Sequence, residues 1–394
     1  MVRLMANEIR MLFIRAFRPL MLYEGIMARG MIMRRDVLKL MGAGLSAAAL
    51  PDSGAAASRF PKGAIIRTVL KDLPPEVLTG GATLFHEHMS LAPDFMPRWI
   101  ALARSLPGRA QTNPAAARGA PASTPAPPAQ PFFLQDAELM TEEMRAAARD
   151  GVACIVDQGH PDMGRDLEFL KRISSQSGLP IVAGFGYYTQ PFYPPEIAAW
   201  SEDRIAKELI RQAKTQPVGV LGEIGTWDVM TSDERKVFRA VAKAHRATNL
   251  AIVTHTNFGK GALEQLDVLE SAGVKPGRVA IGHVGGLNDA AAEVPKAAAK
   301  RGAFVGFDRQ GGSGDGVQVK MVMAMLEAGY AENLLFSSDF TGGASQLKHN
   351  GGPGYAKTVT VFVPKLREAG VDDKTLHGIL VDNPLRLLSF VPKR

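Results

Sequence analysis

The sequence predicts an α/β fold of the (β/α)₈ TIM-barrel type, because short apolar runs alternate with longer amphipathic runs from residue 82 onward. This alternation is typical of βα units, which form a parallel sheet. Eight short runs are expected to be strands, which is the number in this barrel. In chain order the expected strands span residues 82–88, 152–157, 180–186, 218–223, 251–255, 279–283, 303–307 and 334–339.

The longer runs have the spacing of amphipathic helices, with apolar residues three or four positions apart. The expected helices between strands span residues 139–149, 166–177, 202–215, 232–248, 261–272, 290–301 and 320–328. Two further helices, 358–369 and 373–389, would close the barrel after the last strand. His245 and His377 fall on these helices and are expected at the surface.

The composition is ordinary for a globular protein: the 394 residues are 46% hydrophobic and 22% charged. The net charge is +7, but residues 1–57 carry eight Lys/Arg and four Asp/Glu, which leaves +3 for the remainder. This balance does not indicate nucleic acid or another polyanionic partner. The single cysteine, Cys154, excludes an internal disulfide and lies in an apolar run, so we expect a buried thiol.

Residues 1–57 are predicted to be an N-terminal extension that contains a signal peptide of the twin-arginine type. Arg34 and Arg35 precede an apolar stretch that ends at Leu50, and residues 55–57 are small, as at a cleavage site. The apolar stretch is too short to span a bilayer stably. The sequence therefore predicts export to the periplasm by the twin-arginine machinery, with an amphipathic extension as the alternative.

Residues 58–394 are expected to form the barrel, with one insertion at about 105–131. The insertion is rich in Pro and Ala and lacks hydrophobic periodicity, so it cannot bury enough apolar surface to order itself. Because it follows the first strand, it would leave from the C-terminal face of the barrel, where active sites lie. It could be a lid or a surface loop.

A histidine pair marks the end of the first expected strand. His86 and His88 are two residues apart, so both side chains point to the same face of the strand. Two neutral imidazoles directed at one point can bind a metal ion. The pair alone is more often a pair of core histidines with satisfied hydrogen bonds.

Potential metal ligands also end four other expected strands, at Glu223, His255, His283 and Asp339. Because the C-terminal ends of barrel strands meet at one rim, the six side chains are expected to converge. Their nitrogen and oxygen donors suit Zn²⁺ better than Mg²⁺ or Ca²⁺, with manganese, cobalt and iron also open. Two divalent cations in one mouth would need a bridging anion, and Glu223 is the best placed carboxylate.

Together these motifs resemble the phosphotriesterase-like family of the amidohydrolase superfamily. The resemblance runs from about residue 80 to residue 390, through 83–88, 222–225, 254–256, 282–283, 338–339 and 383–384. It implies a binuclear site bridged by the residue of the fourth strand and a hydroxide. One metal would be held by His86, His88 and Asp339, and the other by His255 and His283.

The bridging position differs from that of many family members. They have a carbamylated lysine where this chain has Glu223, whereas the members named phosphotriesterase homology proteins also have glutamate. The difference argues more against phosphotriester hydrolysis than against the metal site.

Two further residues are expected to bind the substrate. Residues 306–311 resemble the Asp-Arg segment of lactonase-type members, whose arginine lies near the pocket, and Arg309 matches it. Tyr188 resembles an aromatic residue beside the metals. A surface salt bridge for Arg309 and core packing for Tyr188 are the alternatives.

We therefore predict a binuclear metal-dependent hydrolase of lactones or related small-molecule esters. Two cations would lower the pKa of the water between them, and Asp339 would accept the proton of the hydroxide as the catalytic residue. The alternative within this class is a phosphotriesterase, an aryldialkylphosphatase. The alternative from another functional class is a metal-containing barrel that binds a ligand without catalysis. The resemblance also favours a homodimer.

Overall fold

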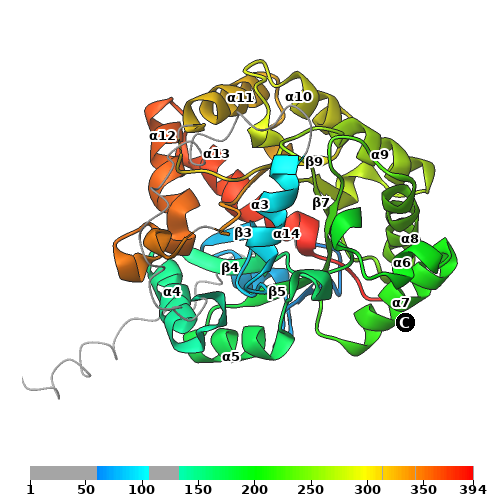
Figure 1. The fold of residues 1–394 in the computed structure, drawn as a ribbon. Helices are drawn as coiled ribbons and strands as arrows, with labels where there is room; N and C mark the ends of the chain where they lie inside the picture. The colour runs from blue at the N-terminus through cyan, green and yellow to red at the C-terminus, as the bar shows by residue number, and fades with distance from the viewer. Residues whose placement is uncertain (1–59, 106–132, 313, 342, 394) are drawn as a thin grey trace, which may run out of the picture. The chain divides into compact units, whose positions relative to one another are not determined.

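The computed structural model describes residues 60–105, 133–312, 314–341 and 343–393, which belong to the compact unit Arg59–Arg394. Strands occupy its centre and helices surround them (Figure 1). The structure does not describe residues 106–132, which include all of the expected insertion except Ser105. The expected signal peptide precedes residue 60, where the description begins. Both therefore lie outside the described residues.

Eight parallel strands form one sheet in sequential order, which confirms the predicted (β/α)₈ TIM barrel. At the seam between first and last strand, the Asp339 amide donates to the His86 carbonyl at 3.1 Å. The strands are β3 (Ala82–Glu87), β4 (Val152–Asp157), β5 (Ile181–Phe185), β6 (Val220–Gly225), β7 (Ile252–His255), β8 (Val279–Ile281), β9 (Phe304–Phe307) and β10 (Leu334–Phe336).

Several outer helices begin at a residue whose side chain caps the first turn. Asp136, Asp166 and Ser201 accept hydrogen bonds from the first turns of α4, α5 and α7, and Thr231 forms a capping box with Glu234 at α8. The helices are α3 (Phe95–Ser105), α4 (Ala137–Arg149), α5 (Leu167–Ser177), α6 (Glu196–Ala199), α7 (Glu202–Thr215), α8 (Ser232–Thr248), α9 (Ala262–Ser271), α10 (Glu293–Lys300), α11 (Asp315–Glu327), α12 (Val363–Glu368), α13 (Asp373–His377) and α14 (Asn383–Leu388).

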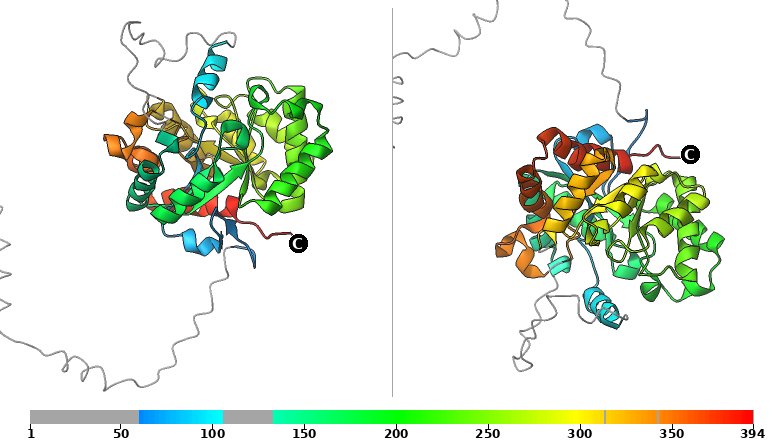
Figure 2. Two further views of the ribbon diagram at one scale, coloured as in Figure 1. Left: turned by 60° about the horizontal axis from the view of Figure 1, so that its bottom comes forward. Right: turned by 90° about the horizontal axis from the view of Figure 1, so that it is seen from above.

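The two ends of the barrel are closed by different elements. Figure 2 shows α3 at one end and, at the other, α14 with the hairpin of β1 (Ile66–Arg67) and β2 (Asp72–Leu73). Successive side chains of a strand point to opposite faces of the sheet, which separates two apolar clusters. Ile155 packs in a cluster with residues of the outer helices, and Val156 packs in a second cluster with residues of the hairpin and α14. The hairpin end is therefore filled with apolar side chains, and polar strand-end residues collect at the α3 end.

Several details differ from the sequence prediction. α3 and the hairpin were not predicted, α11 begins five residues before the expected position 320, and π-helical turns at Thr358–Phe362 and Gly378–Asp382 interrupt the closing helices. The expected surface position of His245 is wrong: it is buried, with Nδ1 2.7 Å from the Leu250 carbonyl oxygen. Cys154 is buried, as expected. No helix among the described residues is both long and apolar enough to cross a bilayer.

Candidate metal centre

The structure brings all six predicted ligands together at the C-terminal ends of the strands. His86 and Glu223 lie within β3 and β6, and His255 is the last residue of β7. The others, His88, His283 and Asp339, lie one to three residues beyond β3, β8 and β10. All six are buried, although their side chains are polar or charged.

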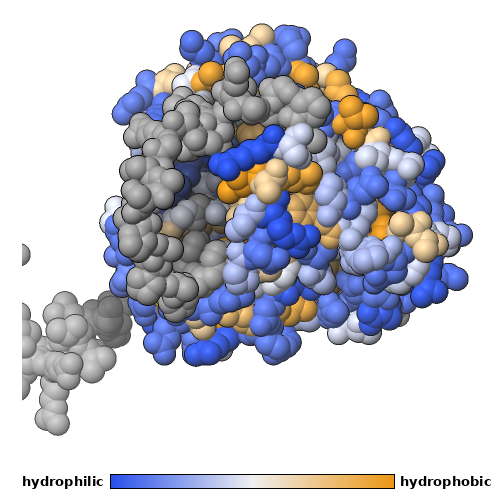
Figure 3. All heavy atoms as spheres, in the orientation of Figure 1, coloured by the Kyte–Doolittle hydropathy of each residue, from blue (hydrophilic) through white to orange (hydrophobic). Residues whose placement is uncertain are grey.

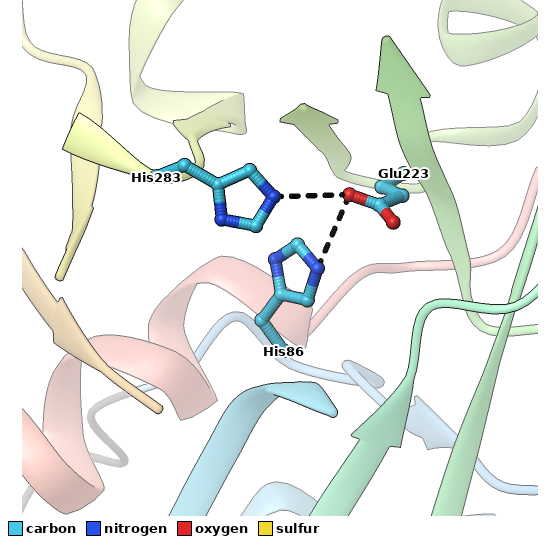
Figure 4. A group of neighbouring side chains, drawn as sticks. All are labelled: His86, Glu223 and His283. Atoms are coloured by element: carbon cyan, nitrogen blue, oxygen red, sulfur yellow. Dashed lines mark ion pairs between the residues drawn. The ribbon is translucent and has the colours of Figure 1, made fainter. Parts of the chain in front are cut away.

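The Glu223 carboxylate lies at the middle of this group, and Figure 4 shows His86 and His283 pointing toward it. One oxygen, Oε2, lies 2.9 Å from His255 Nδ1, 3.2 Å from His86 Nε2 and 3.4 Å from His283 Nε2. The other oxygen, Oε1, lies 3.4 Å from His88 Nε2. A carboxylate with both oxygens facing histidine nitrogens has the geometry that a bridging ligand needs.

Two sets of three ligand atoms lie within 4.8 Å of one another. One set is His86, His88 and Asp339, as the family resemblance implies for the first metal. The other joins His86 and Glu223 with His283, whereas the expected second set paired His283 with His255. These two histidines are nevertheless adjacent, with His283 Nε2 2.8 Å from His255 Nδ1.

The hydrogen bonding of the histidines fits metal ligation. Both ring nitrogens of His86, and Nδ1 of His88, are buried without a hydrogen-bond partner among the described residues. An unsatisfied buried polar group is costly, and a cation on the lone pair would remove that cost. His283 Nδ1 lies 2.8 Å from Asp308 Oδ1, which fixes the proton on Nδ1 and leaves Nε2 free to coordinate.

The pKa values of three of these groups favour the ligand form. Burial opposes ionisation of Glu223, yet the neighbouring His86 and His255 rings hold its pKa well below the usual range. Burial also opposes ionisation of Asp339, but Arg309 and the neighbouring histidines together hold its pKa well below the usual range. Burial lowers the pKa of His255 to about 4, so this ring is neutral at neutral pH. Metal ligands must be deprotonated, and these three groups are.

His88 differs from His255. Burial lowers its pKa, but hydrogen bonds to Asp339 and Glu223 outweigh burial and raise it to about 10. A proton on His88 therefore competes with a cation for the same two carboxylates.

Three residues of the rim have a backbone conformation that side chains rarely adopt. His283, Arg309 and Asp339 have φ values of 61°, 59° and 48°. Non-glycine residues in this left-handed region are uncommon and cluster at functional sites.

A cavity of about 270 Å³ opens above the candidate ligands. Apolar side chains from α3 and the loops form much of its wall, and Figure 3 shows apolar surface near the centre of this face, beside α3. Its lining includes His88, Phe95, Met96, Trp99, Met163, Tyr188, Glu223, His255, Phe258, Arg309, Asp339, Phe340, Gln346 and Lys357. A small organic molecule would fit against the metal ligands.

Both predicted substrate residues line this cavity. The Tyr188 hydroxyl lies 3.1 Å from His255 Nε2 and accepts a hydrogen bond from Trp99 Nε1 at 2.9 Å. Arg309 donates from Nε to Asp339 Oδ2 at 2.7 Å, and its guanidinium lies over the Phe258 ring. Both residues therefore face the space that a substrate would occupy, and their role in substrate binding stays a prediction.

One buried carboxylate that sequence reasoning missed supports the centre. Glu87 lies between the two histidines and accepts hydrogen bonds from the Ser337 hydroxyl, from the amide and hydroxyl of Ser338, and from the Phe340 amide. It thereby fixes the loop that carries Asp339. The alternation of side chains along a strand indicates that Glu87 points away from the histidines. It does not identify the partners of Glu87, which lie about 250 residues further along the chain.

Comparisons with known proteins agree with this geometry. A family model described as the phosphotriesterase family matches residues 68–388. The phosphotriesterase homology protein of Escherichia coli (strain K12) is 33% identical over 261 residues, covering 64% of this chain and 88% of the relative. An aryldialkylphosphatase of Saccharolobus solfataricus is 29% identical over 279 residues (66% and 88%), and an N-acetyltaurine hydrolase of Dictyostelium discoideum is 26% identical over 279 residues (66% and 75%).

Solved structures extend the likeness to most of the barrel. The phosphotriesterase homology protein of Escherichia coli, complexed with phosphate in its active site, superposes with a TM-score of 0.67 at 27% identity, covering 79% of this chain and 99% of that one. A lactonase from Listeria monocytogenes superposes with a TM-score of 0.69 at 26% identity, covering 84% and 100%. From the family match and the shared fold, the chain belongs to the phosphotriesterase family and is a metal-dependent hydrolase.

Proposed function

We propose that the protein is a binuclear hydrolase of lactones or related small esters. The observation that carries this proposal is the convergence on one carboxylate, Glu223, of four histidine nitrogens from three strands or strand ends. Burial of these polar and charged side chains costs free energy, and apolar side chains would stabilise the same core better. Their convergence therefore indicates a functional site.

The ligand set favours two divalent cations, with Zn²⁺ the best match to imidazole and carboxylate donors. In the proposed assignment His86, His88 and Asp339 hold one cation, His255 and His283 hold the other, and Glu223 lies between them. When bound, the cations would polarise the substrate carbonyl and lower the pKa of the water between them, so that hydroxide is available near neutral pH.

The remaining steps fall to side chains of this chain. Asp339 is held ionised by Arg309 and can accept a proton during attack. Arg309 and Tyr188 both line the cavity and would orient the substrate. The apolar wall excludes water from the acyl group, which strengthens each of these polar contacts.

The substrate class rests on the size of the cavity and on the relatives. A cavity of about 270 Å³ suits a small ring or a short acyl chain, and one structural neighbour is a lactonase. The alternative is phosphotriester hydrolysis, which the relative named aryldialkylphosphatase favours. Against it, by the family resemblance, stands Glu223 in place of a modified lysine.

Metal analysis combined with a substrate panel tests the proposal. Purified protein loaded with Zn²⁺ should contain two metal ions per chain and should hydrolyse γ-butyrolactones or 4-nitrophenyl esters faster than diethyl 4-nitrophenyl phosphate or N-acetyltaurine. A preference for the phosphotriester would select the alternative, and a preference for N-acetyltaurine would move the activity to amides. Fewer than two metals per chain would refute the binuclear site.

A barrel that only binds a ligand would behave differently. In that case no member of the panel would be turned over, and the His86→Ala and Asp339→Asn variants would keep both their fold and their affinity for the ligand. Loss of turnover in these variants, with the fold retained, supports the hydrolase instead.

We also propose that the protein is exported to the periplasm. Residues 34–57 support this proposal through the arginine pair, the apolar stretch and the small residues that follow. Fractionation of expressing cells tests it: the Arg34→Lys/Arg35→Lys double variant should remain inside the cell, whereas the parent protein should be recovered from the periplasm with a shortened N-terminus.

A further inference from the structure

Lys357 places a buried amine on the wall of the cavity that contains the candidate metal ligands. It follows the short helix Gly354–Ala356, and 9% of the residue is exposed. Lysines are almost never buried to this degree unless an anion accompanies them. Neither the family comparison nor the proposed reaction accounts for a lysine here.

The contacts of Lys357 leave its charge without a counterion. Within the described residues, the ammonium donates one hydrogen bond, to Gln346 Oε1 at 3.3 Å, and no carboxylate lies within ion-pair distance. The nearby Asp315 already pairs with Lys365. Burial lowers the pKa of Lys357, while the more distant Glu87, Asp315 and Asp339 raise it.

The backbone makes room for this side chain. A Cβ atom added to Gly311, which has a φ of 84°, would collide with Cε of Lys357. The loop after β9 therefore lets the lysine stem pass close to its backbone into the cavity. A stem packed in this way loses little further conformational freedom when the ammonium binds a partner.

Lys357 and Arg309 are the lysine and arginine that line the cavity. Arg309 is engaged with Asp339, so its charge is matched within the protein. Lys357 shares the lining of the cavity with the apolar side chains of Phe95, Trp99 and Phe340. An ammonium in such low-polarity surroundings attracts an anion more strongly than it would in water.

We infer that Lys357 binds an anionic group of the substrate, so that the preferred substrates are small esters or lactones that carry a second group such as a carboxylate. The inference rests on the proposed hydrolase function and adds the charge of the substrate to it. Lys357 would then be a specificity-determining residue that contacts the substrate from the wall of the cavity.

Matched neutral and anionic esters test the inference. With Zn²⁺-loaded protein, kcat/KM is measured for mono(4-nitrophenyl) succinate and for 4-nitrophenyl butyrate, and for γ-butyrolactone with and without a γ-carboxylate. We expect an anionic-to-neutral ratio of about ten or more, the value of a charge-assisted hydrogen bond. A ratio near one in the unmodified protein would overturn the inference without any variant.

Variants then assign the preference to the lysine. Lys357→Met should bring the ratio close to one, and Lys357→Arg should keep it above one. Lys365→Met is the control, because it removes the same charge from a residue that is paired with Asp315 and does not line the cavity. Thermal unfolding checks that each variant is folded. An unchanged ratio in folded Lys357→Met would refute the inference.

Binding of inert acids separates this inference from the proposed function. Calorimetric titration with butyrate, succinate, 3-sulfopropanoate and 3-phosphonopropanoate compares a single carboxylate with the same carboxylate plus a second anion of each kind. Tighter binding of the dianions, lost in Lys357→Met, supports the lysine site even if no ester is turned over. Turnover without any preference for a second anion would support the hydrolase and refute the lysine site.

Discussion

The floor and the wall of the cavity are built in different ways. The floor belongs to a group that we call the metal rim, which consists of the six candidate ligands at strand ends: His86, His88, Glu223, His255, His283 and Asp339. Four of them, His88, Glu223, His255 and Asp339, line the cavity. The wall, which we call the apolar wall, consists of Phe95, Met96, Trp99, Phe258 and Phe340 from α3 and the loops. The rim is polar and buried, whereas Met96, Trp99 and Phe258 of the wall are partly or largely exposed.

The two regions also differ in how they are held. Hydrogen bonds across neighbouring strands fix the rim: Glu87 accepts them from the loop after β10, and Asp308 accepts them from His283. In α3 one residue, Phe95, is fully buried, and Trp99 makes its contacts at the edge of the cavity. Segments with few buried contacts open at low cost. Changes in the rim should therefore abolish function, and changes in the wall should alter preference.

The largest effect is expected at the centre of the rim. Glu223→Gln keeps the shape of the side chain but removes the charge between the two proposed cations. Metal content should fall below two per chain, and kcat/KM should fall by about a thousandfold or more, since metal stabilisation amounts to several kcal/mol. Elemental analysis and kinetics measure both. Glu234→Gln, an equally buried carboxylate at the start of α8, is the control and should keep its metal.

Removal of Glu87 should weaken the loop that carries Asp339 without removing any of the candidate ligands. In Glu87→Ala, two hydroxyls and two amides lose their acceptor, which should cost about 3 kcal/mol of unfolding free energy or more. Asp339 would also lose its anchor, so metal affinity should fall by about 10- to 100-fold. Denaturant unfolding and metal titration check these values. Normal metal affinity in the folded variant would show that the loop holds Asp339 by itself.

A smaller effect is expected at Asp308. Asp308→Asn presents an amide to Nδ1 of His283 and can favour the wrong ring tautomer, which places a proton on the coordinating nitrogen. Metal affinity should fall by about tenfold, at the lower end for such partners. Proton NMR of the histidine rings, together with metal titration, distinguishes a tautomer change from a general loosening.

The smallest effect is expected in the wall. Trp99→Phe removes the indole N–H that donates to Tyr188 but keeps an aromatic ring against the cavity. Loss of one such hydrogen bond, about 1 kcal/mol, should change kcat/KM by roughly fivefold and by different factors for different acyl groups. Metal content should remain at two per chain. A uniform thousandfold loss would erase the distinction between wall and rim.

Residues in regular strands were the easiest to predict. The eight strands and the six candidate ligands follow from local patterns, because a side chain at the end of a barrel strand reaches the same rim whatever the rest of the sequence. α3 was missed because it lies next to the Pro- and Ala-rich insertion, and its apolar face packs on Tyr188 and Phe192 from a different loop. The burial of His245 was not predicted, because helical spacing does not show that its ring nitrogen lies beside the Leu250 carbonyl oxygen.

The sequence by itself determined the barrel and the chemical types at its mouth, because both depend on short-range periodicity. Tertiary structure alone decided which groups complete the site. Asp308 reaches His283 because β8 and β9 are neighbours, Glu87 reaches Ser338 because the first and last strands meet, and Lys357 enters the cavity because Gly311 leaves it space. Such pairs depend on distances in the closed barrel between residues that lie 25 to 251 positions apart along the chain, which local patterns do not encode.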